Sequence, residues 1–262
     1  MASTLSVRAF ELLCLALWLG GLRWVRSTKN PVYAGVYTAS TLLVLFDWMF
    51  NSNWFFRVQY DSKFIALWRI HGVLQPVALA MNYAFYFGAP VALLVHFRDR
   101  LDRRFGSAGW LVVFAVSCAA LPVFEIPMVR WLHLWHYYQR PAFLLGGVPW
   151  SNIWYSGLLT TTCYGAVRLA VRWAGWPSRV EGPVAALVGA GGLVGAGGLV
   201  GAGGPLGEGE VPLATAGADR ERWWRSFAIA LAGIWAAFYL SMLVQLIWYA
   251  VAQPWAPTPR PF

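Results

Sequence analysis

Six long runs of apolar residues constrain this chain more than any other feature of its sequence. They cover residues 5 to 22, 33 to 50, 74 to 96, 109 to 125, 149 to 171 and 225 to 250. A helix needs roughly 20 residues to cross a hydrocarbon core about 30 Å thick, and each run is close to this length or longer. The sequence therefore predicts an all-α fold, a polytopic bundle of about six transmembrane helices, with residues 1–262 forming one integral membrane domain.

The composition excludes other classes of protein. Charged residues make up only 12% of the chain and hydrophobic residues 59%, whereas about 25% of the residues of a soluble domain are charged. The chain holds 17 Trp, 11 Tyr and 16 Phe, and amphipathic aromatic rings are favoured where a helix leaves the hydrocarbon. The net charge of +9 does not indicate nucleic acid, because the arginines are spread over the ends of the apolar runs. The predicted partner is the lipid bilayer.

Alternating the loops between the two sides of a membrane divides the 20 basic residues unequally. Thirteen fall on one side: Arg23, Arg26, Lys29, Arg98, Arg100, Arg103, Arg104, Arg168, Arg172, Arg179, Arg220, Arg222 and Arg225. Seven fall on the other: Arg8, Arg57, Lys63, Arg69, Arg130, Arg140 and Arg260. Because cytoplasmic loops are enriched in Lys and Arg, we predict a cell-membrane protein whose termini lie on the non-cytoplasmic side.

A low-complexity segment interrupts this pattern. Residues 187–204 are three copies of Leu-Val-Gly-Ala-Gly-Gly, and each glycine costs a helix about 1 kcal/mol relative to alanine. We therefore predict a cytoplasmic glycine-rich loop over residues 177–222. A seventh span through the repeat is the alternative, because small residues also pack helices together in lipid.

Function in such a chain depends on the polar groups that a bilayer makes costly. Three carboxylates lie within the apolar runs, namely Glu11, Asp47 and Glu125, and all three are expected near the non-cytoplasmic end. Glu11 lies close enough to the start of its helix to reach water, which favours a structural or interfacial role. Asp47 shares a helix face with Asn51 and is either a structural or a functional group. Glu125 lies between Pro122 and Pro127, where a broken helix is tolerated only in a protein interior or beside a cavity.

Further polar and aromatic residues are expected on the same side of the membrane as these carboxylates. Residues 128–138 carry two tryptophans and two histidines at helical spacing, which is typical of an interfacial helix. A metal site is the weaker interpretation of the histidines, and we predict neither a metal nor a cofactor. The residues predicted to bind a substrate are Asn51, His71, Asn82, Tyr83, His133, His136, Tyr137, Tyr138, Trp150, Asn152 and Trp154.

Part of this pattern resembles a known family. Glu125, the pair Tyr137-Tyr138, the segment Gly146-Gly-Val-Pro-Trp150 and Trp154 are similar to the carotenoid-biosynthesis family of bacterial membrane proteins, which includes carotenoid hydratases. The resemblance covers residues 40 to 175. The phrase Phe-Glu-Ile-Pro-Met-Val, followed by Gly-Gly-Val-Pro-Trp-Ser-Asn, also resembles uncharacterised bacterial multipass proteins of similar length. The chain departs from the hydratase pattern at His133 and His136, where small or non-ionisable residues are expected.

The resemblance implies a lyase-type reaction on an isoprenoid or carotenoid lipid. Hydration or cyclisation of a polyene begins with protonation by a neutral acid in a dry site, and Glu125 and Asp47 are the predicted catalytic residues. Aromatic side chains would then stabilise a carbocation through cation–π attraction. The alternative is a non-enzymatic membrane protein, a small transporter or an assembly factor, in which the same carboxylates bind a cation or hold helices together.

Overall fold

The computed structural model describes residues 2–47, 58–70, 73–137, 144–173 and 213–252, and these residues are mostly helical. The α-helices are α1 (Thr4–Thr28), α2 (Pro31–Leu42), α4 (Val77–Tyr83), α5 (Ala89–His96), α6 (Arg98–Phe105), α7 (Gly109–Ile126), α8 (Trp150–Trp173) and α10 (Leu213–Ala252). Two 3₁₀-helices, η1 (Leu43–Phe46) and η3 (Gly106–Ala108), and two π-helices, η2 (Ala84–Gly88) and η4 (Pro127–Trp131), extend or join them.

Within the described residues, each of the six predicted runs is mostly helical, although residues 74–76 belong to a strand and residues 48–50 lie outside the described residues. Among the described residues, four helical stretches are long and apolar enough to cross a membrane: Thr4–Thr28, Val77–His96, Arg98–Trp131 and Arg220–Ile247. The stretch Pro31–Phe46 is apolar but shorter. These findings confirm a bundle of apolar helices of the kind found in membrane proteins.

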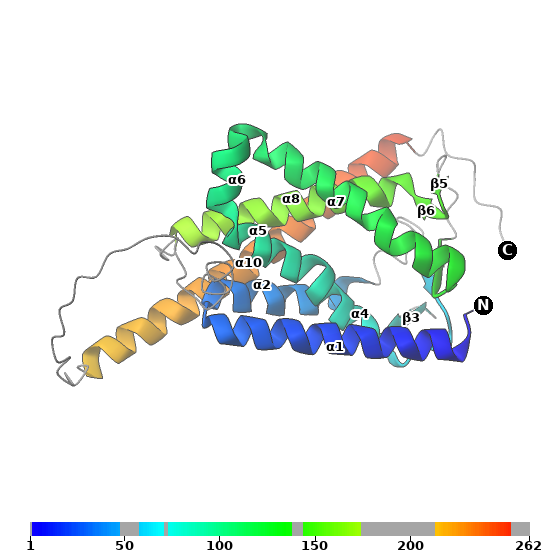
Figure 1. Cartoon of the computed structure of the whole chain (residues 1–262), viewed down its shortest axis with the longest axis horizontal. Helices are drawn as coiled ribbons and strands as arrows, with labels where there is room; N and C mark the ends of the chain where they lie inside the picture. The colour runs from blue at the N-terminus through cyan, green and yellow to red at the C-terminus, as the bar shows by residue number, and fades with distance from the viewer. Residues whose placement is uncertain (1, 48–57, 71–72, 138–143, 174–212, 253–262) are drawn as a thin grey trace, which may run out of the picture.

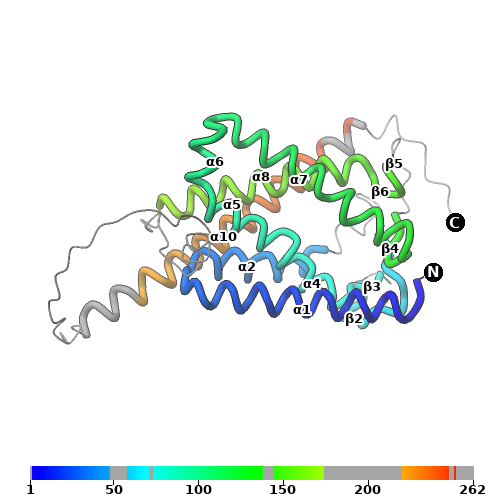
Figure 2. The backbone as a smooth tube through the Cα atoms, in the orientation of Figure 1, coloured from blue at the N-terminus to red at the C-terminus, as the bar shows by residue number. Residues whose placement is uncertain are grey.

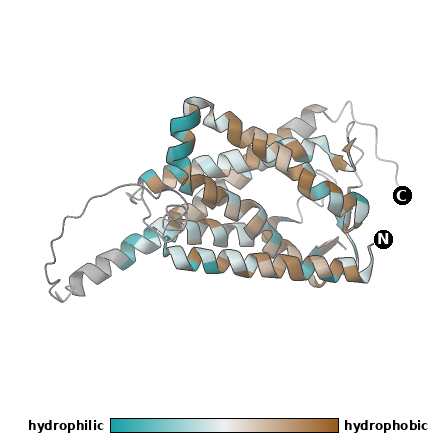
Figure 3. Ribbon diagram, in the orientation of Figure 1, coloured by the Kyte–Doolittle hydropathy of each residue, from teal (hydrophilic) through white to brown (hydrophobic). Residues whose placement is uncertain are grey.

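The basic residues gather at one end of this bundle. In Figure 1, α1 runs from the N-terminus to the end where α6, the last turns of α8 and the first half of α10 also lie. Helix α6 is the most hydrophilic of the helices there (Figure 3). Arg168 of α8 forms a bidentate ion pair with Asp102 of α6, with Nη2 to Oδ2 at 2.7 Å. The described parts of the segments that were assigned to one side from the sequence therefore share one end of the molecule.

The opposite end carries short strands, which the sequence did not predict. They form three two-stranded antiparallel sheets within the described residues: β1 (Val58–Tyr60) with β4 (Trp135–Tyr137), β2 (Ala66–Ile70) with β3 (Val73–Pro76), and β5 (Leu144–Leu145) with β6 (Val148–Pro149). Figure 2 shows β2, β3 and β4 near the N-terminus. With two to five residues each, these strands are too short for alternation of polar and apolar residues to predict them.

Strand β4 also contradicts the predicted interfacial helix over residues 128–138. The π-helix η4 ends at Trp131, and His133 adopts a left-handed backbone conformation with φ of 51°. A left-handed residue does not continue a right-handed helix, so the chain leaves the helix and enters β4. Trp135 is consequently buried rather than placed at an interface.

The predicted glycine-rich loop differs from the structure at its C-terminal boundary. Helix α10 begins at Leu213, so residues 213–222 are helical rather than part of the loop. This stretch is rich in Ala, Arg and Glu, which are strong helix formers. The repeat at 187–204 lies outside the described residues, as does the choice between loop and seventh span.

Small residues allow the helices of the core to approach closely. A Cβ atom on Gly35 of α2 would lie 2.6 Å from the carbonyl oxygen of Phe227 in α10, and one on Gly157 of α8 would lie 3.0 Å from the ring of Phe114 in α7. Close backbone packing at such positions is a common way for helices to associate in lipid. These contacts bring η1, α7, α8 and α10 around the cavity described below.

Candidate functional site

A cavity of about 80 Å³ lies where η1, β1, α4, η2, α7, β4, α8 and α10 meet. A buried water needs only about 10–15 Å³ on this measure, so the cavity has room for several waters or for part of a larger ligand. Its lining includes both predicted catalytic residues. Four predicted substrate-binding residues line it as well: Asn82, Tyr83, Tyr137 and Asn152.

Asp47 follows η1 directly and is only 1% exposed. Its carboxylate accepts hydrogen bonds from two phenols that come from different parts of the chain. The hydroxyl of Tyr60 in β1 lies 3.2 Å from Oδ2, and the hydroxyl of Tyr83 at the end of α4 donates to Oδ1. The carboxylate therefore joins a helix end, a strand and a second helix.

Glu125 lies near the end of α7 on another wall of the cavity. The hydroxyl of Tyr137 in β4 donates to Oε2 at 2.6 Å, and the side-chain amide of Asn152 in α8 donates to the same oxygen at 3.0 Å. The Asn152 amide nitrogen also lies 2.9 Å from the Tyr137 hydroxyl. Within the described residues, the hydrogen-bond partners of Glu125 are all uncharged.

Two π-helical turns flank the cavity. The N–H of Leu132 bonds the carbonyl of Pro127, and the N–H of Ala89 bonds the carbonyl of Ala84, each five residues back. Proline has no N–H to continue an α-helical ladder, and Pro127 and Pro90 lie at or just after these turns. π-turns inside helices are frequent at functional sites.

The predicted break between Pro122 and Pro127 therefore takes a different form. Helix α7 continues through Pro122 and widens into the π-helix η4 instead of stopping. The second π-turn, η2, was not predicted. Pro90 is the residue that could have indicated this π-turn in the sequence, but it lies inside an uninterrupted apolar run.

Strand β1 and strand β4 together form one wall of the cavity, which we call the β1–β4 ribbon. Val58 pairs with Tyr137, and Tyr60 pairs with Trp135. Because side chains alternate across a strand, these four share one face, and all four line the cavity. The remaining pair, Gln59 with His136, faces the other way.

The phenols of the ribbon are held in their protonated form. Burial raises the pKa of Tyr60 well above its usual value, and the nearby Asp47, with a smaller contribution from Glu125, raises it further. Burial likewise raises the pKa of Tyr137, and Glu125 adds to that effect. Both phenols therefore remain hydrogen-bond donors at neutral pH. Asp47 and Glu125 line the same cavity.

The other predicted binding residues do not line the cavity. Trp150 is 58% exposed, and Trp154, one turn further along α8, is also outside the lining. The rings of His133 and His136 lie 5.9 Å apart, centroid to centroid, outside the cavity. Burial lowers the pKa of His136, and His133 lowers it further. Asn51, His71 and Tyr138 lie outside the described residues.

Sequence reasoning missed Tyr60. It lies between two apolar runs, and only the pairing of β1 with β4 brings it to the carboxylates, so no local pattern could have identified it. Among the described residues, no group of three or more His, Cys, Asp or Glu side chains is placed to hold a metal ion.

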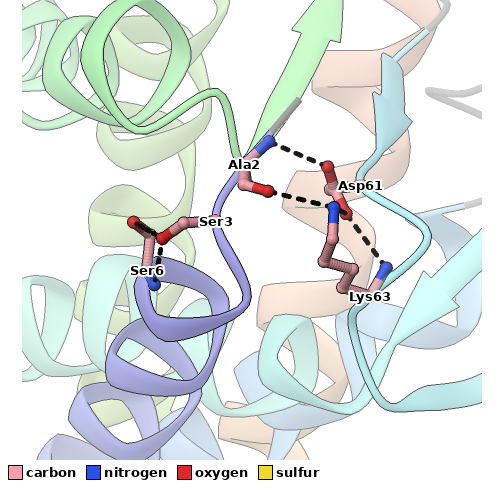
Figure 4. A network of polar contacts seen from close by, with 5 residues as sticks. All are labelled: Ala2, Ser3, Ser6, Asp61 and Lys63. Atoms are coloured by element: carbon pink, nitrogen blue, oxygen red, sulfur yellow. Dashed lines mark hydrogen bonds and ion pairs between the residues drawn. The ribbon is translucent and has the colours of Figure 1, made fainter.

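The third predicted carboxylate, Glu11, belongs to a different structure at the same end. It forms an ion pair with Arg8 and accepts a hydrogen bond from the backbone N–H of Ile65 at 2.7 Å. Nearby, Asp61 accepts hydrogen bonds from the backbone N–H groups of Ala2 and Lys63, both at 3.0 Å, as Figure 4 shows. We call this set the N-terminal clasp: Ala2, Arg8, Glu11, Asp61, Lys63 and Ile65.

Comparison with known proteins adds no assignment to this geometry: no family model, no curated protein and no solved structure matches the chain.

Proposed function

We propose that this protein is a multipass membrane enzyme that protonates an unsaturated lipid of the isoprenoid or carotenoid class and so starts its hydration or cyclisation. The observation that carries the proposal is the environment of Glu125. It lines the cavity, and the side chains that donate to it are a phenol and an amide, with no cation among its described partners. Glu125 is partly buried, and a partly buried carboxyl group that has no counter-charge among the described residues favours its neutral form, which is the form that donates a proton.

The walls of the cavity suit a cationic intermediate. Tyr86, Phe87, Phe124 and Trp135 line it together with the ribbon. An aromatic face stabilises a nearby cation by about 0.5 to 2 kcal/mol, with the larger values in dry surroundings. Protonation of an isolated alkene produces a carbocation, so the acid and the aromatic walls serve consecutive stages of one reaction.

The proposal places the site in a membrane. All six apolar helices span it, the termini lie on the non-cytoplasmic side of the cell membrane, and the end that carries α6 faces the cytoplasm. The unequal division of the basic residues supports this orientation. The cavity then lies in the outer half of the bilayer, where an apolar substrate can be supplied from the lipid.

Cysteine labelling tests the orientation. In a background without Cys14, Cys118 and Cys163, single cysteines replace Ser107 in η3 and Arg69 in β2, both of which are exposed. An impermeant thiol reagent added to intact cells should label Arg69→Cys and spare Ser107→Cys. Labelling of both variants from outside contradicts the proposed topology.

Lipid analysis tests the activity. Total lipids from cells with the gene, without it, and with the Glu125→Gln variant are compared by mass spectrometry. We expect one unsaturated lipid to accumulate in the deletion strain and in the variant strain, and its hydrated or cyclised product to appear with the wild type. Identical lipid profiles in all three strains contradict the enzyme proposal.

One observation favours a second candidate, a non-enzymatic protein that binds a cation, such as a small transporter. Two distorted helices, at η2 and η4, flank a cavity lined by two carboxylates and the amide of Asn82, and oxygen groups near unwound helices coordinate cations in transporters. Sodium and potassium titrations of the purified protein separate the candidates. A cation-dependent rise in melting temperature that Glu125→Gln abolishes, with unchanged lipids, supports this second candidate.

A further inference from the structure

The side-chain amide of Asn82 lines the cavity, and the proposed acid chemistry does not explain its role. Leu79, Asn82, Tyr83 and Tyr86 lie on one face of α4 and η2, at helical spacing, and all four line the cavity. Asn82 is 9% exposed, and its side-chain oxygen is buried without a hydrogen-bond partner in the described part of the chain. The amide of Asn152, in contrast, is engaged by Glu125 and Tyr137.

Other buried amides show that a missing partner alone does not define a site. Gln75 in β3 and Gln245 in α10 are fully buried, and their side-chain oxygen and nitrogen atoms also lack partners among the described residues. Neither of them lines the cavity. Asn82 differs because it lines the cavity. A buried acceptor without a partner is costly, so a ligand that supplies a donor is favoured there.

We propose that Asn82 holds the oxygen nucleophile of the reaction, an O–H group that donates to the amide oxygen and adds to the carbocation. This inference rests on the proposed function and narrows it. The product gains a carbon–oxygen bond rather than a new carbon–carbon ring. The O–H group belongs either to a water molecule, which gives hydration, or to a hydroxyl of the substrate, which gives a cyclic ether.

The step balances within the residues of the cavity. The O–H bond of the Glu125 carboxyl breaks, and the π pair of the alkene forms a C–H bond with its proton. The oxygen held by Asn82 uses a lone pair to form a C–O bond at the cationic carbon, and its proton passes to the Asp47 carboxylate. Return of that proton to Glu125 restores the protein, and one double bond has been replaced by a C–H and a C–O bond. With water the substrate gains the elements of H and O–H, and with its own hydroxyl it is isomerised to a cyclic ether.

Asp47 is suited to the role of proton acceptor. It accepts hydrogen bonds from Tyr60 and Tyr83 and lines the same cavity as Glu125. Two carboxyl groups in one site do not readily carry a negative charge together, so one stays ionised when the other is neutral. Tyr83 directly follows Asn82 in α4. The residue that donates to Asp47 and the residue proposed to hold the nucleophile are therefore adjacent in the chain and belong to the same wall.

Isotope labelling tests the role of Asn82. Purified protein is placed in liposomes made from the total lipid of the deletion strain, in D₂O or in heavy-oxygen water. With the wild type, the product should gain deuterium at carbon. Heavy oxygen in the product identifies water as the nucleophile, and a new C–O bond without heavy oxygen identifies a hydroxyl of the substrate.

Asn82→Leu keeps the approximate volume of the side chain and removes the acceptor. We expect deuterium to enter the lipid at close to the wild-type rate while C–O bond formation falls about tenfold, because the cation then loses a proton instead of adding oxygen. Gln245→Leu is the matched control, since it makes the same kind of change outside the cavity and should leave the ratio of C–O formation to deuteration unchanged.

Any of three results overturns the inference while leaving the acid chemistry intact. In the first, C–O formation in Asn82→Leu falls only in proportion to deuteration. In the second, the wild-type product has a new carbon ring and no new C–O bond, and in the third, Gln245→Leu lowers the ratio of C–O formation to deuteration as much as Asn82→Leu does. If Asn82→Leu does not fold, Asn82→Asp is the second variant, because it retains an acceptor and should retain C–O formation. Loss of C–O formation without loss of deuteration in folded Asn82→Asp also overturns the inference. Absence of deuterium from every lipid with the wild type overturns the proposed function itself.

Discussion

Glu11 and Glu125 are both glutamates near the same end of the molecule, yet their surroundings differ in kind. Glu11 in the N-terminal clasp is paired with the guanidinium of Arg8 and accepts a backbone N–H. Glu125 beside the cavity accepts hydrogen bonds only from uncharged side chains within the described residues. A carboxylate with a cation partner holds segments together, whereas one without a cation remains available for proton transfer. The type of partner therefore distinguishes the two roles better than burial does.

The largest effect that this comparison predicts is on turnover. Glu125→Gln keeps the shape of the side chain and removes the acid, and loss of a positioned acid costs about 10² to 10⁴ in rate. We expect product formation per folded molecule to fall by this amount, while the melting temperature in detergent stays near that of the wild type. A large loss of stability with a proportionate loss of activity would instead place Glu125 in the same structural class as Glu11.

A smaller effect is expected from the phenol that positions the acid. Tyr137→Phe removes the hydroxyl that lies 2.6 Å from Glu125 Oε2 and retains the ring against the cavity wall. Loss of one such hydrogen bond should lower turnover about tenfold by loosening the carboxyl group. The measurement is the rate of product formation by the liposome-embedded variant. A rate equal to that of the wild type would show that Asn152 alone suffices to position Glu125.

The clasp should respond in the opposite way. Glu11→Gln removes the ion pair with Arg8 but keeps an oxygen for the N–H of Ile65, and Arg8 is partly exposed. We expect a loss of about 1 kcal/mol in the free energy of unfolding and unchanged turnover per folded molecule. Denaturant titration and the lipid assay on one preparation provide both values. If turnover falls more steeply than stability, Glu11 also contributes to the reaction and the proposed difference between the two glutamates is wrong.

The smallest predicted effect is a dependence of the clasp on pH. Burial alone would raise the pKa of Asp61, but the hydrogen bonds from the N–H groups of Lys63 and Ala2, together with the charge of Lys63, lower it below its usual value. Ionised Asp61 therefore stabilises the folded protein above the unfolded-state pKa, and this contribution is lost as the pH falls through the lowered native pKa. The protection factors of the Ala2 and Lys63 amides, which are exchange rates corrected for the intrinsic effect of pH, should fall in acid. Asp61→Asn should make these protection factors insensitive to pH.

The sequence predicted those parts of the molecule that depend on composition over long windows. All six apolar runs are mostly helical within the described residues, and the described parts of the segments that were expected to share a side lie at one end. Asp47 and Glu125, 78 residues apart in the numbering (125 − 47), line one cavity, as the idea of a shared polar site required. Bilayer physics dictates these features, because a costly carboxylate must face the protein interior.

Features that depend on a single backbone angle or on pairing between distant segments were not predicted. The left-handed conformation of His133 ends a pattern that otherwise continues as a helix, and nothing local distinguishes it. The position of Tyr60 beside Asp47 depends on the pairing of β1 with β4, in which Tyr60 pairs with Trp135 although the two residues are far apart in the sequence. His136 was expected at the site on grounds of residue type, but the alternation of strand side chains turns it to the other face.

The β1–β4 ribbon carries Tyr60, which donates to Asp47, and Tyr137, which donates to Glu125. Because backbone hydrogen bonds fix the spacing of paired strands, the two phenols form one rigid unit. Any displacement of this ribbon, by a substrate entering or a product leaving, would therefore release or engage both acids together. In the proposed reaction, this coupling would make Glu125, the proton donor, and Asp47, the proton acceptor, change position together.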